Sequence, residues 1–330
     1  MKTIKKLLFC VSLLATNLFH AQSTDSEAYL STIESEDLRQ LLYVYASDYF
    51  QGRETGAIGQ KRAVDFLREF YKNRDIKAAK GTEDYFQKML LTINKKKVAT
   101  ENVVAIIEGS EKPDEYIVIS SHLDHIGIHD GQINNGADDD GSGTVSMLEI
   151  AEAFQKAVED GKGPKRSIVF LHVTGEEKGL LGSKYYTDNP LYPLANTIAN
   201  LNIDMVGRTD PKRKSSNPDY IYLIGSDRLS TELHELSEEV NKATVNIELD
   251  YTFNAHDDPN RFYFRSDHYN FGKNNIPVIF YFNGTHADYH KPTDTVEKIE
   301  FDLMKTRAQL IFATAWELAN KKNRIKMNKK

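Results

Sequence analysis

The feature that most constrains the fold is a regular alternation of two kinds of segment from residue 116 onward. Short, almost continuous apolar runs occur at 116–120, 168–173, 199–203, 220–224 and 278–282. Between and after them lie longer segments with apolar residues at helical spacing, at 144–158, 180–186, 229–241 and 301–319. Continuous apolar runs are typical of strands covered on both faces, and their alternation with helices indicates parallel pairing. The sequence therefore predicts an α/β fold with helices on both faces of a mostly parallel, mixed sheet.

The region before residue 102 has a different pattern, in which two helices come before two strands. The expected elements are, in order, helices at 37–49 and 60–71 and strands at 86–93 and 102–107. A polar, glycine-containing stretch at 51–56 separates the helices, and the lysine-rich residues 94–97 predict a solvated hairpin turn. No repeat period divides the chain of 330 residues. We therefore expect residues 22–101 to pack on a core formed by residues 102–330 in one compact unit.

The N-terminus has the features of a secretory signal peptide at residues 1–21. Three lysines within the first six residues precede an apolar run at 7–18, and Ala21 offers a small residue for cleavage. The apolar run is shorter than the roughly 20 residues of a membrane-spanning helix. We therefore expect an exported protein, periplasmic or secreted, with no membrane attachment after cleavage. Cleavage would also remove Cys10, the single cysteine, and leave a mature chain without disulfides.

The overall charge argues against one large class of partners. The sequence contains 48 acidic and 42 basic residues and has a formal net charge of -6. A protein that grips nucleic acid by its phosphates presents a concentrated basic surface, whereas the lysines of this chain are dispersed. We therefore expect no nucleic-acid partner, and the sequence leaves the oligomeric state open.

Carboxylates and histidines follow the predicted strands, where ligands bind in a sheet of this kind. They are His122, Asp124 and His125 after the first strand, Glu176 and Glu177 after the second, Asp204 after the third, and His286, Asp288 and His290 after the last. Three aspartates at 138–140 lie between the first strand and its helix. Because the carboxyl ends of parallel strands meet at one edge, these side chains are expected to converge. Buried acids at this density require a cation, and mixed histidine and carboxylate ligation favours zinc, with manganese or cobalt as alternatives.

Taken together, these segments resemble peptidase family M28, the co-catalytic zinc peptidases that include bacterial leucyl-type aminopeptidases. The resemblance covers residue 102 to the end of the chain and is carried by SHLDHIG, NNGADDDGSG, TGEEKGLLGS, NIDMVG, FRSDHYNF and HADYHKPTDT. It implies a zinc-dependent exopeptidase-like sandwich with two zinc ions. The implied ligands are His122 and Asp204 for the first ion, Glu177 and His290 for the second, and Asp139 as a bridge between them.

The resemblance also implies roles for three further residues. Glu176 would be the general base, because ligation holds the adjacent Glu177 ionised and leaves Glu176 free to move a proton. Asp124 lies two residues after His122 and is placed to accept the remaining N–H of that imidazole. Tyr263 lies where some family members carry a tyrosine that stabilises the oxyanion, although a packing role between its phenylalanine neighbours is the alternative.

The expected function is that of a hydrolase, a metal-dependent exopeptidase acting on peptides. The resemblance favours an aminopeptidase, while a carboxypeptidase would use the same ligands on the same scaffold. A glutaminyl-peptide cyclotransferase is the nearest alternative enzyme, because those proteins resemble this chain in fold and in several ligands. A non-catalytic binding ectodomain is disfavoured, because all five implied ligands are present. The polar loop at 255–261 suits a substrate-facing rim or a plain surface loop.

Overall fold

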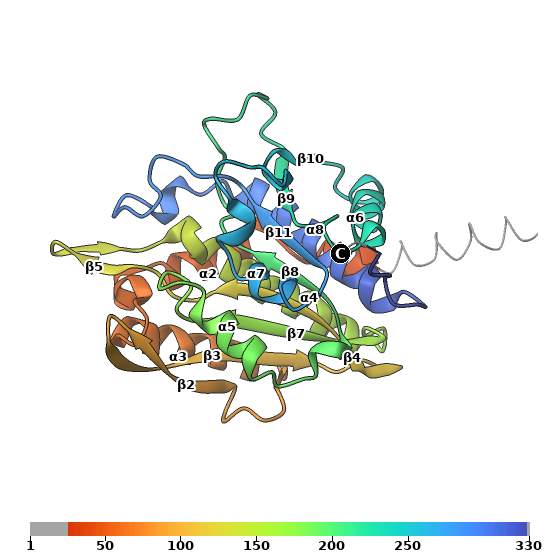
Figure 1. The fold of residues 1–330 in the computed structure, drawn as a ribbon, viewed down its shortest axis with the longest axis horizontal. Coiled ribbons are helices and arrows are strands. Elements are labelled where there is room, and N and C mark those ends of the chain that lie inside the picture. Colours follow the sequence, from red (N-terminus) through yellow and green to blue (C-terminus); the bar gives the residue numbers. More distant parts are fainter. Residues whose placement is uncertain (1–25, 329–330) are drawn as a thin grey trace, which may run out of the picture.

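The structure is a computed structural model that describes residues 26–328 (Figure 1). The predicted signal peptide and Cys10 lie outside the described residues. No helix within 26–328 combines the length and the apolarity that crossing a bilayer requires.

A nine-stranded sheet runs through the molecule, in the order β1-β3-β7-β4-β8-β11-β9-β10, with β2 paired to β3. Its strands are β1 (Lys77–Ala78), β2 (Phe86–Ile93), β3 (Lys96–Ile107), β4 (Lys112–His122), β7 (Arg166–Val173), β8 (Thr197–Ile203), β9 (Tyr220–Ile224), β10 (Glu248–Asp250) and β11 (Val278–Phe282). A separate small hairpin consists of β5 (Gly127–His129) and β6 (Gln132–Asn134).

Parallel pairing is concentrated in the centre of the sheet. The strands β7, β4, β8 and β11 pair in parallel with one another, whereas β3 pairs antiparallel with β7, and β9 pairs antiparallel with β11. The predicted α/β class and mixed sheet are therefore confirmed. The four central strands direct their carboxyl ends to the same edge, as the sequence pattern predicted.

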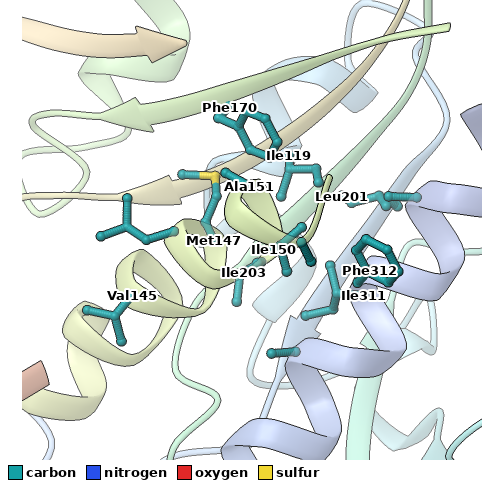
Figure 2. Close-up of a cluster of buried hydrophobic side chains, with 14 of the residues drawn as sticks. Ile119, Val145, Met147, Ile150, Ala151, Phe170, Leu201, Ile203, Ile311 and Phe312 are labelled. Atoms are coloured by element: carbon teal, nitrogen blue, oxygen red, sulfur yellow. The ribbon is translucent and has the colours of Figure 1, made fainter. Parts of the chain in front are cut away.

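Helices cover both faces of the sheet, which is also as predicted (Figure 1). They are α2 (Ser35–Tyr45), α3 (Ile58–Lys72), α4 (Gly143–Glu159), α5 (Leu181–Asp188), α6 (Thr231–Ala243), α7 (His268–Gly272) and α8 (Phe301–Asn320). Side chains of α2, α3, α4, α6 and α8 belong to one buried cluster, and those of α5 and α7 to another. Successive residues of β4 alternate between the two, so that Ile119 packs with α4 and α8 (Figure 2) while Val118 faces α5 and α7. This double burial explains why the central strands are apolar without interruption.

The structure corrects two predicted boundaries in the N-terminal region. The helix expected to reach residue 49 ends at Tyr45, because the backbone of Ser47 is already extended, with φ of -81° and ψ of 161°. The hairpin turn expected at 94–97 consists of Asn94 and Lys95 alone, with φ of 49° and 65°. Two successive residues with positive φ match the twist of the flanking strands, so pairing resumes at once.

The buried Glu149 on α4 gives the fold a dependence on pH that a substitution can test. Burial raises the pKa of Glu149 from 4.5 to about 8, and the nearby carboxylates of Glu152 and Asp37 add to this. Between these pH values the folded state keeps a proton that the unfolded chain has released, so stability falls as the pH rises through this range. Glu149→Gln should therefore raise Tm above about pH 8 and change it little below about pH 4.5.

Thermal unfolding at several pH values measures this, and the expected gain at high pH corresponds to at least about 1 kcal/mol. Glu159→Gln, at an exposed position of the same helix, is the control and should leave the pH profile unchanged. Parallel profiles for wild type and Glu149→Gln would contradict the expectation.

Candidate metal centre

The five residues predicted as metal ligands meet at the carboxyl edge of the parallel strands. His122 is the last residue of β4, Glu177 lies in the turn after β7, Asp204 follows β8, His290 lies in the loop after β11, and Asp139 lies in a short helical turn, Ala137–Ser142, before α4. Four of these residues are buried or nearly so, whereas the side chain of His290 is 36% exposed. The sheet topology therefore brings together residues that are far apart in the sequence.

The carboxylate of Asp139 stands between two groups of side chains. Its Oδ1 lies 3.1 Å from His122 Nε2, which is itself 3.6 Å from Asp204 Oδ1. Its Oδ2 lies 3.1 Å from His290 Nε2, which is 3.2 Å from Glu177 Oε2. Each oxygen of Asp139 thus faces a different histidine–carboxylate pair.

The two neighbouring aspartates serve the backbone instead. Asp140 accepts hydrogen bonds from the backbone N–H groups of His122, Gly143 and Met205, at 3.1, 3.0 and 3.1 Å. Asp138 accepts from the backbone N–H of Gly207 at 2.7 Å and lies 3.1 Å from His286 Nε2. Although Asp140 lies near His122 and Asp204, its oxygens are already occupied. Asp139 is therefore the member of the triplet that is free to face the centre.

The pKa value of each histidine and carboxylate in this cluster depends strongly on the charges of its neighbours. Burial alone would lower the pKa of His122 and His290, but the surrounding carboxylates raise it, to about 10 for His290. Burial alone would raise the pKa of Asp139, yet His125 and His122 hold it well below its usual value. Burial and Asp139 both oppose ionisation of Glu177, but the neighbouring histidines bring its pKa to about 2. The carboxylates are thus stable as anions only next to positive charge, which divalent cations supply.

The spacing of these atoms fits metal ions. Two ligand atoms that share a tetrahedral zinc ion at about 2.0–2.2 Å lie roughly 3.4 Å apart. The four separations around Asp139, 3.1 to 3.6 Å, are close to this value. Histidine nitrogen and carboxylate oxygen are also ligands that zinc accepts. A zinc centre is therefore compatible with the residues present.

Glu176 lies beside these groups and lines the cavity that opens onto them. Its Oε2 is 4.0 Å from His122 Nε2. Burial raises its pKa well above the usual range; the charge of His122 opposes this shift and that of Asp204 adds to it. The cavity is lined by His122, Asp139, Glu176, Asp204, Met205, Phe262, Arg265, Phe280, Phe282, Thr285 and Tyr289. Glu176 is thus a carboxyl group that can carry a proton next to a bound substrate.

The structure corrects the contact predicted for Asp124. Nδ1 of His122 lies 2.9 Å from the backbone carbonyl oxygen of Asp124, whereas the carboxylate is 4.0 Å away. The turn after β4 places the carbonyl next to the ring and directs the side chain elsewhere. There, the Asp124 carboxylate accepts hydrogen bonds from Thr55 Oγ1 at 2.8 Å and from the backbone N–H of Glu176 at 3.2 Å. Asp124 therefore positions the segment that carries Glu176.

The structure does not bring Tyr263 to the cavity. Phe262 and Arg265 line it, but a 3-10 turn at Phe262–Phe264 directs Tyr263 to the opposite side, since residues three apart share a face in such a turn. The Tyr263 hydroxyl lies 2.6 Å from where a Cβ atom on Gly272 would stand. Tyr263 is therefore not among the residues that line the cavity, and the tyrosine that does line it is Tyr289.

Arg53 supports the centre from the N-terminal region, which the sequence pattern did not indicate. Its buried guanidinium donates to the backbone carbonyls of Leu123 at 3.0 Å, Asn135 at 2.6 Å and Gly136 at 2.9 Å. Gly52 allows this approach, because a Cβ there would lie 2.3 Å from the carbonyl oxygen of Asn134. The signal available in the sequence was an arginine directly after a glycine within an otherwise unassigned polar stretch. Arg53 thus joins the loop after His122 to the loop before Asp139.

The fold and the site define this protein as an α/β protein with a histidine–carboxylate cluster that is a candidate metal centre. Residues 102–315 match the family model for peptidase family M28. The chain belongs to this family.

Individual proteins with similar sequences or folds include peptidases and a cyclase. Leucine aminopeptidase 1 of Pyrenophora tritici-repentis is 30% identical over 225 residues, which is 66% of this chain and 55% of that protein. The LapA aminopeptidase of Legionella pneumophila has a similar fold, with a TM-score of 0.70 at 21% identity over 90% of this chain and 75% of that one. Glutaminyl cyclase of Porphyromonas gingivalis reaches a TM-score of 0.69 at 17% identity, over 86% of this chain and 97% of that one. The first curated relatives are matched over only 14 to 55% of their own length.

Ser266 offers a test of how the centre is held. Its hydroxyl donates to Asp204 Oδ2 at 2.6 Å and accepts from Asn202 Nδ2 at 2.8 Å. Because such supporting hydrogen bonds typically contribute about 10–100-fold to metal affinity, Ser266→Ala should weaken zinc binding by about this factor. Competition with a chromophoric chelator measures the affinity. Ser237→Ala, a buried serine on α6, is the control and should retain the wild-type affinity; an equal affinity for Ser266→Ala would show that Asp204 needs no such support.

Proposed function

We propose that this protein is a metal-dependent exopeptidase that removes residues from the N-termini of peptides, with two zinc ions at the centre. The observation that carries the proposal is the position of Asp139, whose two oxygens face His122 and His290, with Glu176 free in the adjoining cavity. On one side His122, Asp204 and Asp139 would hold the first ion, and on the other Glu177, His290 and Asp139 would hold the second. Bound zinc supplies Lewis acidity, which lowers the pKa of water and polarises a peptide carbonyl.

The remaining chemistry belongs to side chains of this protein. Glu176 accepts a proton from the attacking water on its carboxylate and donates it to the nitrogen of the leaving peptide. The hydrogen bond from its backbone N–H to Asp124 holds it beside the cavity. Burial raises the pKa of Glu176, so its carboxyl group holds a proton more readily than that of an exposed glutamate.

The lining of the cavity supports release of single residues with apolar side chains. Met205, Phe262, Phe280 and Phe282 form an apolar wall next to the acidic groups. Such a wall suits the side chain of an N-terminal residue. The similarity to proteins named as aminopeptidases agrees with this assignment.

Arg265 favours a second candidate, a carboxypeptidase. It lines the same cavity, and a guanidinium group binds a carboxylate through two parallel hydrogen bonds. A glutaminyl cyclase is the third outcome that the experiment below distinguishes, because the fold of one such enzyme is similar.

We further propose that the protein is exported, to the periplasm or out of the cell. The support is the basic, apolar and small-residue pattern of residues 1–21. N-terminal sequencing of the protein recovered from the producing cells tests this, since processing after Ala21 is expected.

A peptide panel with blocked ends decides between the candidates. Purified mature protein with zinc should shorten free peptides stepwise from the N-terminus, and a chelator should stop the reaction. N-acetylated peptides should resist, and C-terminally amidated peptides should be cut. Mass spectrometry that shows shortening from the C-terminus would establish the carboxypeptidase instead. Loss of ammonia from peptides with N-terminal glutamine, without shortening, would establish the cyclase.

Glu176→Gln isolates the role of the proposed base. The amide cannot take up the proton of the attacking water, so kcat should fall by at least about 100-fold. Zinc content, measured by mass spectrometry of the metal, should stay at the wild-type level because Glu176 is not among the proposed ligands. Glu54→Gln is a control, since this carboxylate pairs with Lys178 outside the cavity at 3.1 Å. Unchanged kcat in Glu176→Gln would remove the residue from the mechanism.

A further inference from the structure

His125 is a buried histidine next to the centre that has no role in the function proposed above. It lies three residues after His122, and its side chain has no exposure to solvent. Its backbone N–H points to the carbonyl of Arg53, at 3.4 Å, and a Cβ atom on Gly136 would lie 2.6 Å from its ring. The ring is therefore held tightly between the loop after β4 and the turn that carries Asp139.

The Nδ1 atom of His125 faces the second side of the centre. It lies 2.9 Å from Glu177 Oε1 and 3.8 Å from Asp139 Oδ2. The ligand atoms of these three residues all lie within 4.8 Å of one another, which is close enough to hold a metal ion. The rings of His125 and His290 stand edge to face, with centroids 5.7 Å apart.

These atoms lie close together without bonding to one another. Among the described residues, neither ring nitrogen of His125 has a hydrogen-bond partner, and neither do Glu177 Oε1 and Asp139 Oδ2. The 2.9 Å between His125 Nδ1 and Glu177 Oε1 is short enough for a hydrogen bond, so it is the relative orientation of the two groups that does not allow one. A buried polar atom without a partner is unfavourable, because it has lost its hydrogen bonds to water without gaining others. A cation shared by the three residues would satisfy Nδ1 and both oxygens at once.

We propose that His125 is a further protein ligand of the second metal ion, through Nδ1. The second ion would then have four protein ligands, Asp139, Glu177, His125 and His290, while the first would have three, His122, Asp139 and Asp204. Fully ligated sites are typical of tightly held ions, and sites with three protein ligands keep a position open for water or substrate. The second ion is therefore the more firmly bound of the two, and the first is the one that substrate reaches.

The alternative role for His125 is a hydrogen bond that orients Glu177 without touching the metal. The two roles predict different losses of metal affinity when His125 is replaced, and different absorption spectra of bound Co²⁺. Loss of a supporting hydrogen bond typically weakens metal binding by about 10–100-fold, so loss of a direct ligand is expected to exceed about 100-fold. Loss of a ligand also changes the coordination of the ion itself, which the visible absorption of bound Co²⁺ reports.

The experiment titrates metal-free protein with Co²⁺ and follows both calorimetry and the absorption spectrum. Wild type should take up two equivalents. His125→Gln should weaken one of the two steps by more than about 100-fold, change the spectrum of that step and leave the other intact. Glu177→Gln should weaken the same step. His129→Gln, an exposed histidine on β5 in the same segment, is the matched control and should behave as wild type.

The outcomes separate failure of this inference from failure of the proposed function, on which it rests for the second ion. Two unchanged steps in His125→Gln, or a smaller loss with the wild-type spectrum, would overturn the ligand role while leaving the two-metal centre in place. Uptake of fewer than two equivalents by wild type would overturn the two-metal centre itself. Circular dichroism of the metal-free variants guards against misfolding; if His125→Gln does not fold, His125→Asn replaces it under the same criteria.

Discussion

The carboxylate of Asp139 is the group on which the arrangement of the centre depends. One oxygen faces His122 and the other faces His290, so a single buried side chain connects His122 and Asp204, at the ends of β4 and β8, with Glu177 and His290, in the segments after β7 and β11. A buried carboxylate in this position is stable only between positive charges. The neighbouring histidines supply some of this charge, and metal ions would supply it fully.

Much of the surrounding structure serves to hold Asp139 in place. Asp140 binds its turn to the last residue of β4 and to the segment after β8, through the backbone N–H groups of His122 and Met205. Arg53 binds the carbonyls of the residues just before the turn, and Asp294 accepts from the backbone N–H of Asp139 itself at 3.1 Å. Backbone contacts of this kind fix the position of Asp139 within the cluster.

The acidic residues near the centre differ in role because their carboxylates differ in the hydrogen bonds that they already accept. Asp138, Asp140 and Asp124 accept hydrogen bonds from backbone N–H groups and act as structural supports. Asp139 and Glu177 have oxygens without hydrogen-bond partners among the described residues, and both oxygens face the centre. Similar residues thus separate into structural supports and candidate ligands by the availability of their lone pairs. His125 falls into the second group by the same criterion.

The sequence by itself determined the α/β class, most of the central elements and the edge at which the acidic residues meet, because apolar periodicity and chain order are properties of the sequence. The positions of His122, Asp139, Glu177, Asp204 and His290 at or between the strand ends also predicted that they meet at that edge, whereas their roles as metal ligands remain a prediction from the family resemblance. Only the tertiary structure decided that Tyr263 is not among the residues lining the cavity, that the carbonyl of Asp124 contacts His122, that Arg53 reaches the centre, and that Nδ1 of His125 faces Glu177. These outcomes depend on the direction of single side chains, which turns and packing between distant segments set and which residue spacing does not record.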